Sequence, residues 1–237
     1  MPTPSYIITC LENRVIAHDV HELRFTKPEG FTFIPGQFVL FDIPLLENLA
    51  DIQTRAYSIA SAPLEKDLLF VIKMKQGGRA SRWFVESLKA GHDVRMQGPF
   101  GVFTLDRSVP NDWLLIATSA GLAPFRSQLV AFLTEEKRRI DLIFGVHAEE
   151  DFFWLDEIRG LLKSHPNLRL HLTLSVPSPS WPGHVGHVQT LLPDLLKNRP
   201  ATRVYICGNP EMTKDVKRLC IEAYGVAKSD VHMEGYI

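Results

Sequence analysis

The segment Arg55-Ala-Tyr57-Ser58 combines three side chains that could together hold a flat heteroaromatic ligand with a charged tail. Tyr57 offers an aromatic face for stacking. Ser58 offers a hydroxyl for a hydrogen bond to a ring nitrogen, and Arg55 can make a charge-assisted bond to a phosphate. The same residues also suit an ordinary strand with a half-buried tyrosine and a solvated arginine, which is the commoner case for such a segment taken alone.

A second candidate is the run Gly77-Gly78-Arg79-Ala80-Ser81, which opens the one helix predicted in the first hundred residues. Paired glycines let a ligand approach the backbone closely, and a helix N-terminus offers free N–H groups to an anion. Ser81 is the predicted N-cap of this helix, which ends before Gly91. A plain hairpin loop followed by a capped helix explains the run equally well.

Two further segments follow predicted parallel strands and precede predicted helices. They are Thr118-Ser-Ala-Gly121-Leu-Ala-Pro124 and Cys207-Gly208-Asn209-Pro210. In open α/β sheets, ligands bind outside the carboxyl ends of the strands. The first segment lacks the G-x-G-x-x-G pattern, and a single buried cysteine is commonly structural. Glu234-Gly235-Tyr236 stands just before the last residue of the sequence and by itself reads as a frayed tail.

The order of these motifs is more informative than any one of them. Arg-x-Tyr-Ser, Gly-Gly-x-x-Ser, Gly-Pro-Phe-Gly, Thr-x-x-Gly-x-x-Pro, Cys-Gly-Asn-Pro-x-Met and Glu-x-Tyr succeed one another along the chain. In this the sequence resembles the ferredoxin–NADP reductase superfamily from about Pro35 to Ile237. It is similar in particular to the compact bacterial reductases that serve flavodoxin, ferredoxin or oxygenase partners.

The resemblance implies a role for each matching residue. Arg55 would bind the flavin phosphates, Tyr57 would lie against the isoalloxazine, and Ser58 would bond near its N5. The remaining positions match the flavin pyrophosphate loop (Gly77, Gly78, Ser81), the NAD(P) loop (Thr118, Gly121, Pro124) and the nicotinamide and hydride-transfer region (Cys207, Gly208, Glu234). Tyr236 falls where relatives often carry an aromatic residue over the flavin. Ser58, Cys207 and Glu234 are the residues expected to act in the hydride transfer.

The pattern of elements predicts two domains. Short strands rich in β-branched and aromatic residues fill the first hundred residues and predict an antiparallel β-barrel. After Gly101, apolar runs alternate with helical patterns, which predicts an α/β domain with a parallel sheet. One of these helices is predicted from Leu155 onward, with Asp151 as its N-cap, and Gln97–Gly101 is read as a turn. The composition shift near Ser108–Asp112 places the boundary, giving a flavin domain at 1–107 and a nucleotide domain at 108–237.

The sequence also favours particular cofactors. We expect FAD rather than FMN, because the loop at residues 77–81 matches a pyrophosphate-binding loop and FMN carries only a monophosphate. The resemblance favours NADH over NADPH, because NADPH-selective relatives usually place an arginine for the 2′-phosphate at a stretch that here, Ser175–Ser178, holds none, although His147 or Arg203 could substitute. The pairs His18/His21 and His184/His187 have no completing ligands, so no metal site is expected.

Composition limits the partners. Twenty-six Lys and Arg against twenty-seven Asp and Glu give a net charge of −1, so nucleic acid is not an expected partner. No membrane span or signal peptide is apparent, which favours the cytoplasm. Three dispersed cysteines cannot ligate an iron–sulfur cluster, so electrons must leave to a separate one-electron carrier: a ferredoxin, a flavodoxin or an oxygenase component. A basic patch expected to dock it comprises Lys73, Lys75, Arg79 and Arg82.

Two other functions remain open at the level of sequence. A flavin reductase would release reduced flavin as a product, whereas an electron-transfer reductase would hold its flavin tightly. A non-catalytic subunit of a larger complex would use the fold only to dock. The presence of both Cys207 and Glu234 argues against lost catalysis.

Overall fold

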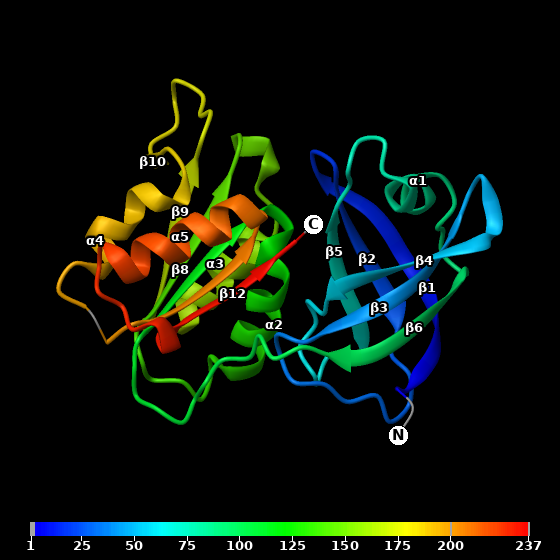
Figure 1. Cartoon of the computed structure of the whole chain (residues 1–237), viewed down its shortest axis with the longest axis horizontal. Coiled ribbons are helices and arrows are strands. Elements are labelled where there is room, and N and C mark those ends of the chain that lie inside the picture. Colours follow the sequence, from blue (N-terminus) through cyan, green and yellow to red (C-terminus); the bar gives the residue numbers. More distant parts are fainter. Residues whose placement is uncertain (1–2, 200, 237) are drawn as a thin grey trace. The chain divides into compact units, whose positions relative to one another are not determined.

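The computed structural model describes residues 3–199 and 201–236, so Ile237 lies outside it. Contacts divide the chain into two compact units, which Figure 1 shows as a barrel-like sheet and a helix-covered sheet. The first unit contains residues 1–105 and 126–131, and the second contains residues 106–125 and 132–237. The antiparallel sheet followed by a parallel α/β sheet confirms the predicted fold class.

The described part of residues 1–105 in the first unit forms a six-stranded antiparallel sheet with a helix. Its elements are β1 (Ser5–Ala17), β2 (Val20–Thr26), β3 (Phe38–Leu45), β4 (Asn48–Ser58), β5 (Asp67–Lys73), α1 (Arg79–Glu86) and β6 (Asp93–Phe100). The strand order is β4-β3-β6-β1-β2-β5, and the two end strands contact each other, which closes the sheet toward a barrel. Phe25, Phe41 and Phe70 pack edge-on at its centre and are fully buried. Burial of each such side chain contributes about 1.5–3 kcal/mol.

The second unit is a parallel sheet with helices. Its elements are β7 (Trp113–Thr118), η1 (Ser119–Gly121), α2 (Leu122–Phe132), β8 (Ile140–Val146), η2 (Glu149–Asp151), α3 (Leu155–Ser164), β9 (Leu168–Leu174), β10 (His184–Val185), η3 (Val188–Leu191), α4 (Leu192–Leu196), β11 (Arg203–Gly208), α5 (Pro210–Glu222), η4 (Lys228–Asp230) and β12 (Val231–Gly235). Helices α4 and α5 bury one face of the sheet (Figure 1), over residues such as Ile116 and Ile206. Phe144 points to the other face and packs against Phe152 and Phe153.

The strand order in this sheet, β10-β9-β8-β7-β11-β12, sets where a ligand can bind. The chain builds outward from β7 through β8 and β9, then crosses back to lay β11 on the other side of β7. The order therefore reverses between β7 and β11. Loops leave the sheet in opposite directions at such a switch point, which opens a crevice at the carboxyl ends of the two strands.

Several local predictions were wrong. The first helix begins at Arg79 with Gly78 as its N-cap, so Ser81 lies inside the helix. The helix at Leu155 has Trp154 as its N-cap, because Asp151 belongs to η2, where its carboxylate accepts a hydrogen bond from the Ala148 N–H at 3.1 Å. Asp151, predicted as the N-cap of α3, is thus part of the short helix η2 instead.

Two segments assigned to turns or tails are strands. Gln97–Phe100 forms the end of β6 and pairs with both β1 and β3. Glu234 and Gly235 lie in β12, which runs parallel to β11 from Val204↔Val231 to Gly208↔Gly235. These five residues are too short a run to predict alone, and pairing with β11 is what makes them a strand.

Candidate flavin and nucleotide sites

The end of β4 carries the three residues of the Arg-x-Tyr-Ser motif. Arg55 and Tyr57 are two residues apart and so share one face of the strand, whereas Ser58 points to the other. Arg55 is exposed, and its guanidinium donates to Gln53 Oε1 at 2.8 Å and to the Thr54 carbonyl at 3.0 Å. This leaves a cation at the surface beside an aromatic ring, which suits an anionic ligand with a flat body.

Tyr57 links this strand to helix α1. Its ring packs edge-on against Phe84 of α1 at 5.4 Å, with an interplanar angle of 89°, and lies 5.2 Å from Phe41 of β3. Burial raises the pKa of the Tyr57 hydroxyl, and the nearby Arg55 charge opposes this only in part. The phenol is therefore neutral at physiological pH.

The amino end of α1 is built to accept an anion. Gly77 has a φ of +69°, which favours glycine, and a Cβ on Gly78 would lie 3.0 Å from the Lys75 carbonyl. Among the described residues, no side chain caps the helix at Gly78, and the first turn, Arg79-Ala80-Ser81, contains no carboxylate. The Ser81 hydroxyl instead accepts a hydrogen bond from the Lys75 N–H at 2.9 Å and fixes the loop. Uncapped N–H groups and the helix dipole fit a phosphate or pyrophosphate.

In the second unit, the predicted residues gather at the switch point between β7 and β11. A Cβ on Gly121 would lie 2.2 Å from the Cys207 carbonyl oxygen, and one on Gly208 would lie 2.2 Å from Thr118 Oγ1. The Asn209 N–H donates to Thr118 Oγ1 at 3.2 Å. Only glycines permit this close approach of η1 to the end of β11, so the backbone of the loop lies directly over the strand ends.

The last strand brings the terminal residues to the same edge. Glu234 on β12 stands opposite Cys207 on β11, and the Tyr236 N–H donates to the Gly208 carbonyl at 2.8 Å. Burial raises the pKa of the Cys207 thiol well above its ordinary value, the Glu234 charge raises it further, and a hydrogen bond with Tyr236 opposes both. The raised pKa keeps the thiol in its neutral form at physiological pH.

Pro124 is the third residue of α2, in its first turn as expected, and it is buried. Asn209, to which the sequence reading gave no role, caps α5 by accepting hydrogen bonds from Glu211 N at 2.8 Å and Met212 N at 3.2 Å. The Asn-Pro pair before a helix is the signal for this cap, since asparagine favours the N-cap and proline the first helical position.

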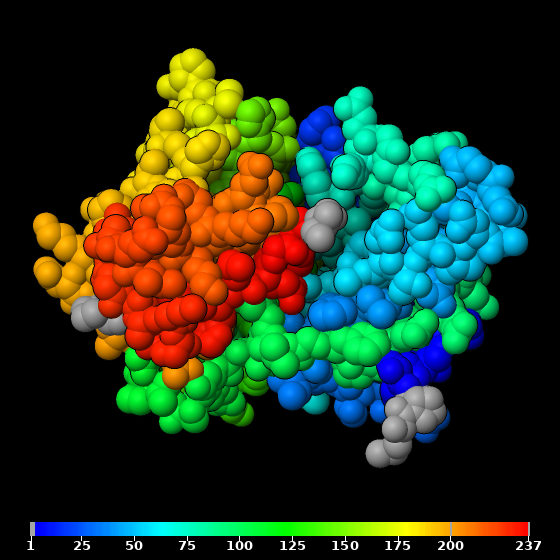
Figure 2. Space-filling model, in the orientation of Figure 1, coloured from blue at the N-terminus to red at the C-terminus, as the bar shows by residue number. Residues whose placement is uncertain are grey.

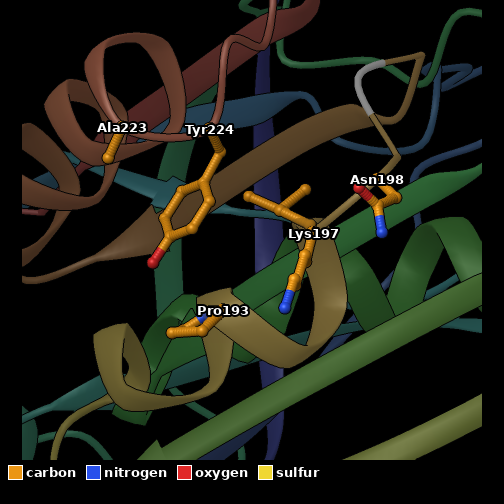
Figure 3. A pocket seen from close by; sticks show the side chains of 6 residues that line it. Pro193, Lys197, Asn198, Ala223 and Tyr224 are labelled. Carbon is orange, nitrogen blue, oxygen red and sulfur yellow. The ribbon is translucent and has the colours of Figure 1, made fainter.

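A hollow of about 300 Å³ lies elsewhere in the second unit (Figure 3). Its lining includes Lys197 after α4 and Tyr224 after α5, whose side chains lie close to each other in the figure. Helices that follow parallel strands end near the amino ends of the strands, so this hollow is at the opposite edge of the sheet from Thr118 and Cys207. None of the predicted site residues lines it.

The histidine pairs show no arrangement for a metal. The His21 ring bonds to Asn13 Oδ1 through Nδ1 at 2.8 Å, and His18 Nε2 lies 3.3 Å from Asp19. Within the part of the chain that the structure describes, no group of three or more His, Cys, Asp or Glu side chains is placed to hold a metal ion. A search of the same residues finds no helix long and apolar enough to cross a membrane.

Comparisons with known proteins identify the family of each part of the chain. Residues 8–105 match the oxidoreductase FAD-binding domain, and residues 115–218 match the oxidoreductase NAD-binding domain. A two-domain flavin and pyridine nucleotide oxidoreductase is thus the class that fold and sites define. The chain belongs to the ferredoxin–NADP reductase superfamily, since it is 34% identical to ferredoxin–NADP reductase B of Sorangium cellulosum over 94% of both chains.

Other relatives are longer than this chain. It is 28% identical to the ferredoxin–NAD(P)(+) reductase component of naphthalene dioxygenase and salicylate hydroxylase systems from Ralstonia, and it covers 65% of that protein. The fold matches a cytochrome P450 reductase of Amycolatopsis with a TM-score of 0.87 and 24% identity, covering 99% of this chain and 71% of that one. The chain is an NAD(P)H-dependent flavoprotein reductase.

Proposed function

We propose that the chain transfers a hydride between NAD(P)H and a bound FAD and passes the electrons singly to a separate carrier: a ferredoxin, a flavodoxin or an oxygenase component. Residues 1–107 would bind the flavin and residues 108–237 the pyridine nucleotide. The observation that carries this proposal is that one chain contains both an uncapped N-terminus on α1, the helix whose Phe84 packs against Tyr57, and a glycine-lined switch point at Thr118 and Cys207. Each is an anion and ring site of the kind that a dinucleotide needs.

In the first unit, the chain's residues would bind and orient the flavin. Arg55 would pair with its phosphates, and the N–H groups after Gly77 and Gly78 would bind the pyrophosphate, with Ser81 fixing the loop. Tyr57 would lie against the ring system, and Ser58 would donate a hydrogen bond to it. When bound, the flavin supplies the conversion between two-electron and one-electron chemistry.

In the second unit, the chain's residues would place the nicotinamide. The loop from Thr118 through Gly121 to Pro124 would receive the nucleotide phosphates at the amino end of α2. Cys207 and Gly208 would shape the surface for the nicotinamide ring. Glu234 would set the charge beside it. The task of these groups is to hold two rings at reacting distance, because a correctly held pair removes most of the entropic barrier.

We further propose that NADH is preferred to NADPH. Glu149 accepts hydrogen bonds from the Ser178 N–H at 3.1 and 3.3 Å and from the Ser178 hydroxyl, so a carboxylate stands in the loop that would need a cation for a 2′-phosphate. Arg203, one possible substitute, begins β11 and pairs with Asp106 and Asp230, at the other edge of the sheet. The Sorangium relative carries NADP in its name, so kcat/KM for both nucleotides decides the matter. A value for NADPH tenfold above that for NADH would refute the preference.

The experiment for the whole proposal is a spectrum of the purified protein followed by anaerobic titration with NADH and NADPH. A tightly bound yellow cofactor that runs as FAD after heat release, and that either nucleotide bleaches, is expected. Flavin that runs as FMN would refute the FAD assignment, and flavin that leaves the protein once reduced would point to the flavin reductase instead. A chain that binds no flavin and reduces no dye would favour the alternative that it is a non-catalytic subunit of a larger complex.

Ser58→Ala tests the assignment within the site. Loss of one hydrogen bond of about 0.5–1.5 kcal/mol predicts flavin reduction roughly 2- to 12-fold slower in rapid mixing, with FAD content unchanged. Ser164→Ala, at an exposed serine that ends α3, is the matched control and should reduce at the wild-type rate. Equal rates in all three proteins would remove Ser58 from the mechanism.

A further inference from the structure

Helix α1 ends on backbone carbonyls that a distant side chain completes. The last turn of a helix leaves carbonyl groups without partners inside the helix. Here the Ser87 and Leu88 N–H groups both donate to the Trp83 carbonyl, at 2.9 and 3.0 Å. In a regular α-helix, the Leu88 N–H would donate to the Phe84 carbonyl. That carbonyl instead accepts a hydrogen bond from Asn13 Nδ2 at 2.8 Å, and the Leu88 carbonyl accepts one from the same atom at 2.9 Å. One side chain of β1 thus holds the carboxyl end of α1.

The chemistry of these partners fixes which way the Asn13 amide points. A carbonyl oxygen only accepts hydrogen bonds, so the atom that faces two carbonyls must be the amide nitrogen. The amide oxygen then faces the His21 ring, with Oδ1 2.8 Å from Nδ1. Because this oxygen has no hydrogen to donate, Nδ1 must carry the proton of the bond. His21 on β2 therefore orients Asn13 on β1, and Asn13 holds the end of α1.

His21 is itself fixed by the sheet. It stands opposite Val15 of β1 and Ile72 of β5, and it is 9% exposed. Burial lowers the pKa of His21, and the nearby Asp19 charge opposes this only in part. The ring is therefore neutral at physiological pH. A neutral ring carries one N–H, and the bond to Asn13 requires that it be on Nδ1.

Helix α1 depends on such contacts for its placement. It has eight residues, and helices this short are marginal in water unless tertiary contacts hold them. Trp83 and Phe84 are buried, and the Phe84 ring packs edge-on against Tyr57 at 5.4 Å. The carbonyl and the ring of Phe84 thus connect Asn13 to the tyrosine proposed to lie against the flavin. The amino end of the same helix, after Gly78, is the proposed pyrophosphate site.

We propose that Asn13, oriented by His21, is a positioning residue for the flavin site and acts by holding α1 in place. This inference rests on the proposed binding of FAD. Every residue in this series of contacts lies within residues 13–88 of the first unit. Without the Asn13 amide, the Phe84 ring would no longer support Tyr57 from a fixed position. Because α1 is only about 12 Å long, a shift at its carboxyl end would also move its amino end.

The chain offers a matched control for stability alone. Thr26 Oγ1 accepts a hydrogen bond from the Thr9 N–H at 2.9 Å, and this bond also joins β2 to β1. Thr26 is the last residue of β2, whereas His21 is near its start, so the two bonds lie at opposite ends of the strand pair. Thr26→Val keeps the shape of the side chain but removes the hydroxyl acceptor. It should therefore lower stability without disturbing α1.

The experiment dilutes the FAD-loaded full chain and measures the fluorescence of released flavin, which gives the dissociation constant for FAD. Asn13→Ala is expected to raise this constant about tenfold or more, because it removes two hydrogen bonds that hold α1. His21→Leu should raise it less, and His21→Asn should recover most of the affinity, since an asparagine amide can donate where Nδ1 did. The Asn13→Ala/His21→Leu double variant should bind no more weakly than Asn13→Ala, because His21 acts through Asn13. Thr26→Val should lower the melting temperature but keep the constant within about twofold of wild type.

Opposite results would overturn the inference. Wild-type FAD affinity in Asn13→Ala, or an equal loss of affinity in Thr26→Val at a matched loss of melting temperature, would reduce Asn13 to a structural residue. Nitrogen-15 NMR of the histidine rings should show His21 protonated on Nδ1, and a proton on Nε2 alone would refute the orientation. If Asn13→Ala does not fold, His21→Leu replaces it, and wild-type affinity there would count against the inference. A wild-type chain that binds no FAD would refute the proposed function, and this inference with it.

Discussion

The thiol of Cys207 is fully buried at the end of β11, opposite Glu234 on β12. A thiol near the hydride path could act through its charge or through its shape. Burial and the neighbouring carboxylate both raise its pKa, so the neutral form predominates at physiological pH. A neutral sulfur can pack against a ring but does not attack it.

This neutrality predicts slow labelling of the native protein by a thiol reagent. Cys10 and Cys220 are also buried, and burial raises the pKa of Cys220 to about 12. Because a raised pKa keeps a thiol protonated below that value, no cysteine should react quickly between about pH 7 and 9. Absorbance of the released thiolate checks this, with three equivalents expected after denaturation. One fast equivalent in the folded protein would show that a thiol is accessible.

At the scale of elements, glycines decide how closely the loop after β7 approaches the end of β11. Gly121 leaves no room for a Cβ, which would lie 2.2 Å from the Cys207 carbonyl. Backbone cannot move aside cheaply in a close-packed interior. η1 can therefore approach β11 this closely only because residue 121 is a glycine, which has no Cβ.

Gly121→Ala should therefore displace the loop. Overpacking of this kind costs about 1–3 kcal/mol, and we expect both a lower melting temperature and a raised KM for the nucleotide. Gly160→Ala in α3 is the control, since its Cβ would enter open space; it should stabilise the protein by about 0.5–1 kcal/mol. Equal nucleotide KM values in the two variants would show that the loop tolerates the methyl group.

A second element-scale feature is the buried charge at the start of β8. Asp141 is fully buried and bonds to Arg139 at 2.7 Å, His171 at 2.9 Å and Arg199 at 3.0 Å. Burial alone would raise its pKa, but the hydrogen bonds from these three residues outweigh it and hold the pKa well below its ordinary value. The network joins β8, β9 and the segment before β11.

Asp141 should make stability depend on pH in the acid range. A lowered pKa in the fold means that its contribution is complete above the ordinary value of 3.8 and is lost as the pH falls through the folded value. Asp141→Asn should cost about 3–5 kcal/mol at pH 7, because it leaves buried cations without their partner. Urea unfolding from pH 7 to 3 checks this: the wild-type and variant curves should converge at low pH. Parallel curves would assign the acid sensitivity to other groups.

At the scale of the whole molecule, a net charge of −1 attracts a charged partner only weakly, so recognition of a partner must depend on local groups of charged residues. On the surface shown in Figure 2, the β3–β4 hairpin lies beside α1, where Arg82 pairs with Glu47 and Glu86 and Arg79 lies 3.9 Å from Asp51. Lys73 donates to the His18 carbonyl at 2.6 Å. The predicted basic patch is therefore interleaved with carboxylates.

Charge reversal at Lys75 tests whether this surface meets an acidic carrier. The Lys75→Glu variant should slow reduction of the carrier several-fold at low salt and flatten its salt dependence, because rim charges act mainly on association. Reduction of ferricyanide should not change. Lys163→Glu, an exposed lysine on α3, is the control. Unchanged carrier kinetics in Lys75→Glu would place the electron exit elsewhere.

The two-domain fold could be predicted because its signals are local. Runs such as Trp113–Ala117 and Ile140–Gly145 are apolar enough to be buried strands wherever they lie, and Arg203–Cys207 follows the same rule. The glycine motifs could be read in the same way, since glycine is required where backbones come close.

Other features depend on partners distant in sequence. Glu234 lies in a strand only because β11 pairs with β12, and the Ser81 hydroxyl is bound by Lys75 rather than serving as a cap. In the sequence, Arg126 is an ordinary helix residue. Its partners Glu65 and Ala60 lie more than sixty positions earlier, and only the folded chain brings them within hydrogen-bond distance. Local propensity and hydrophobic periodicity depend on residues that are neighbours in the sequence, so they can be read without the fold. Which side chain completes which buried polar group is settled only when the chain has folded, because that choice depends on distances in space.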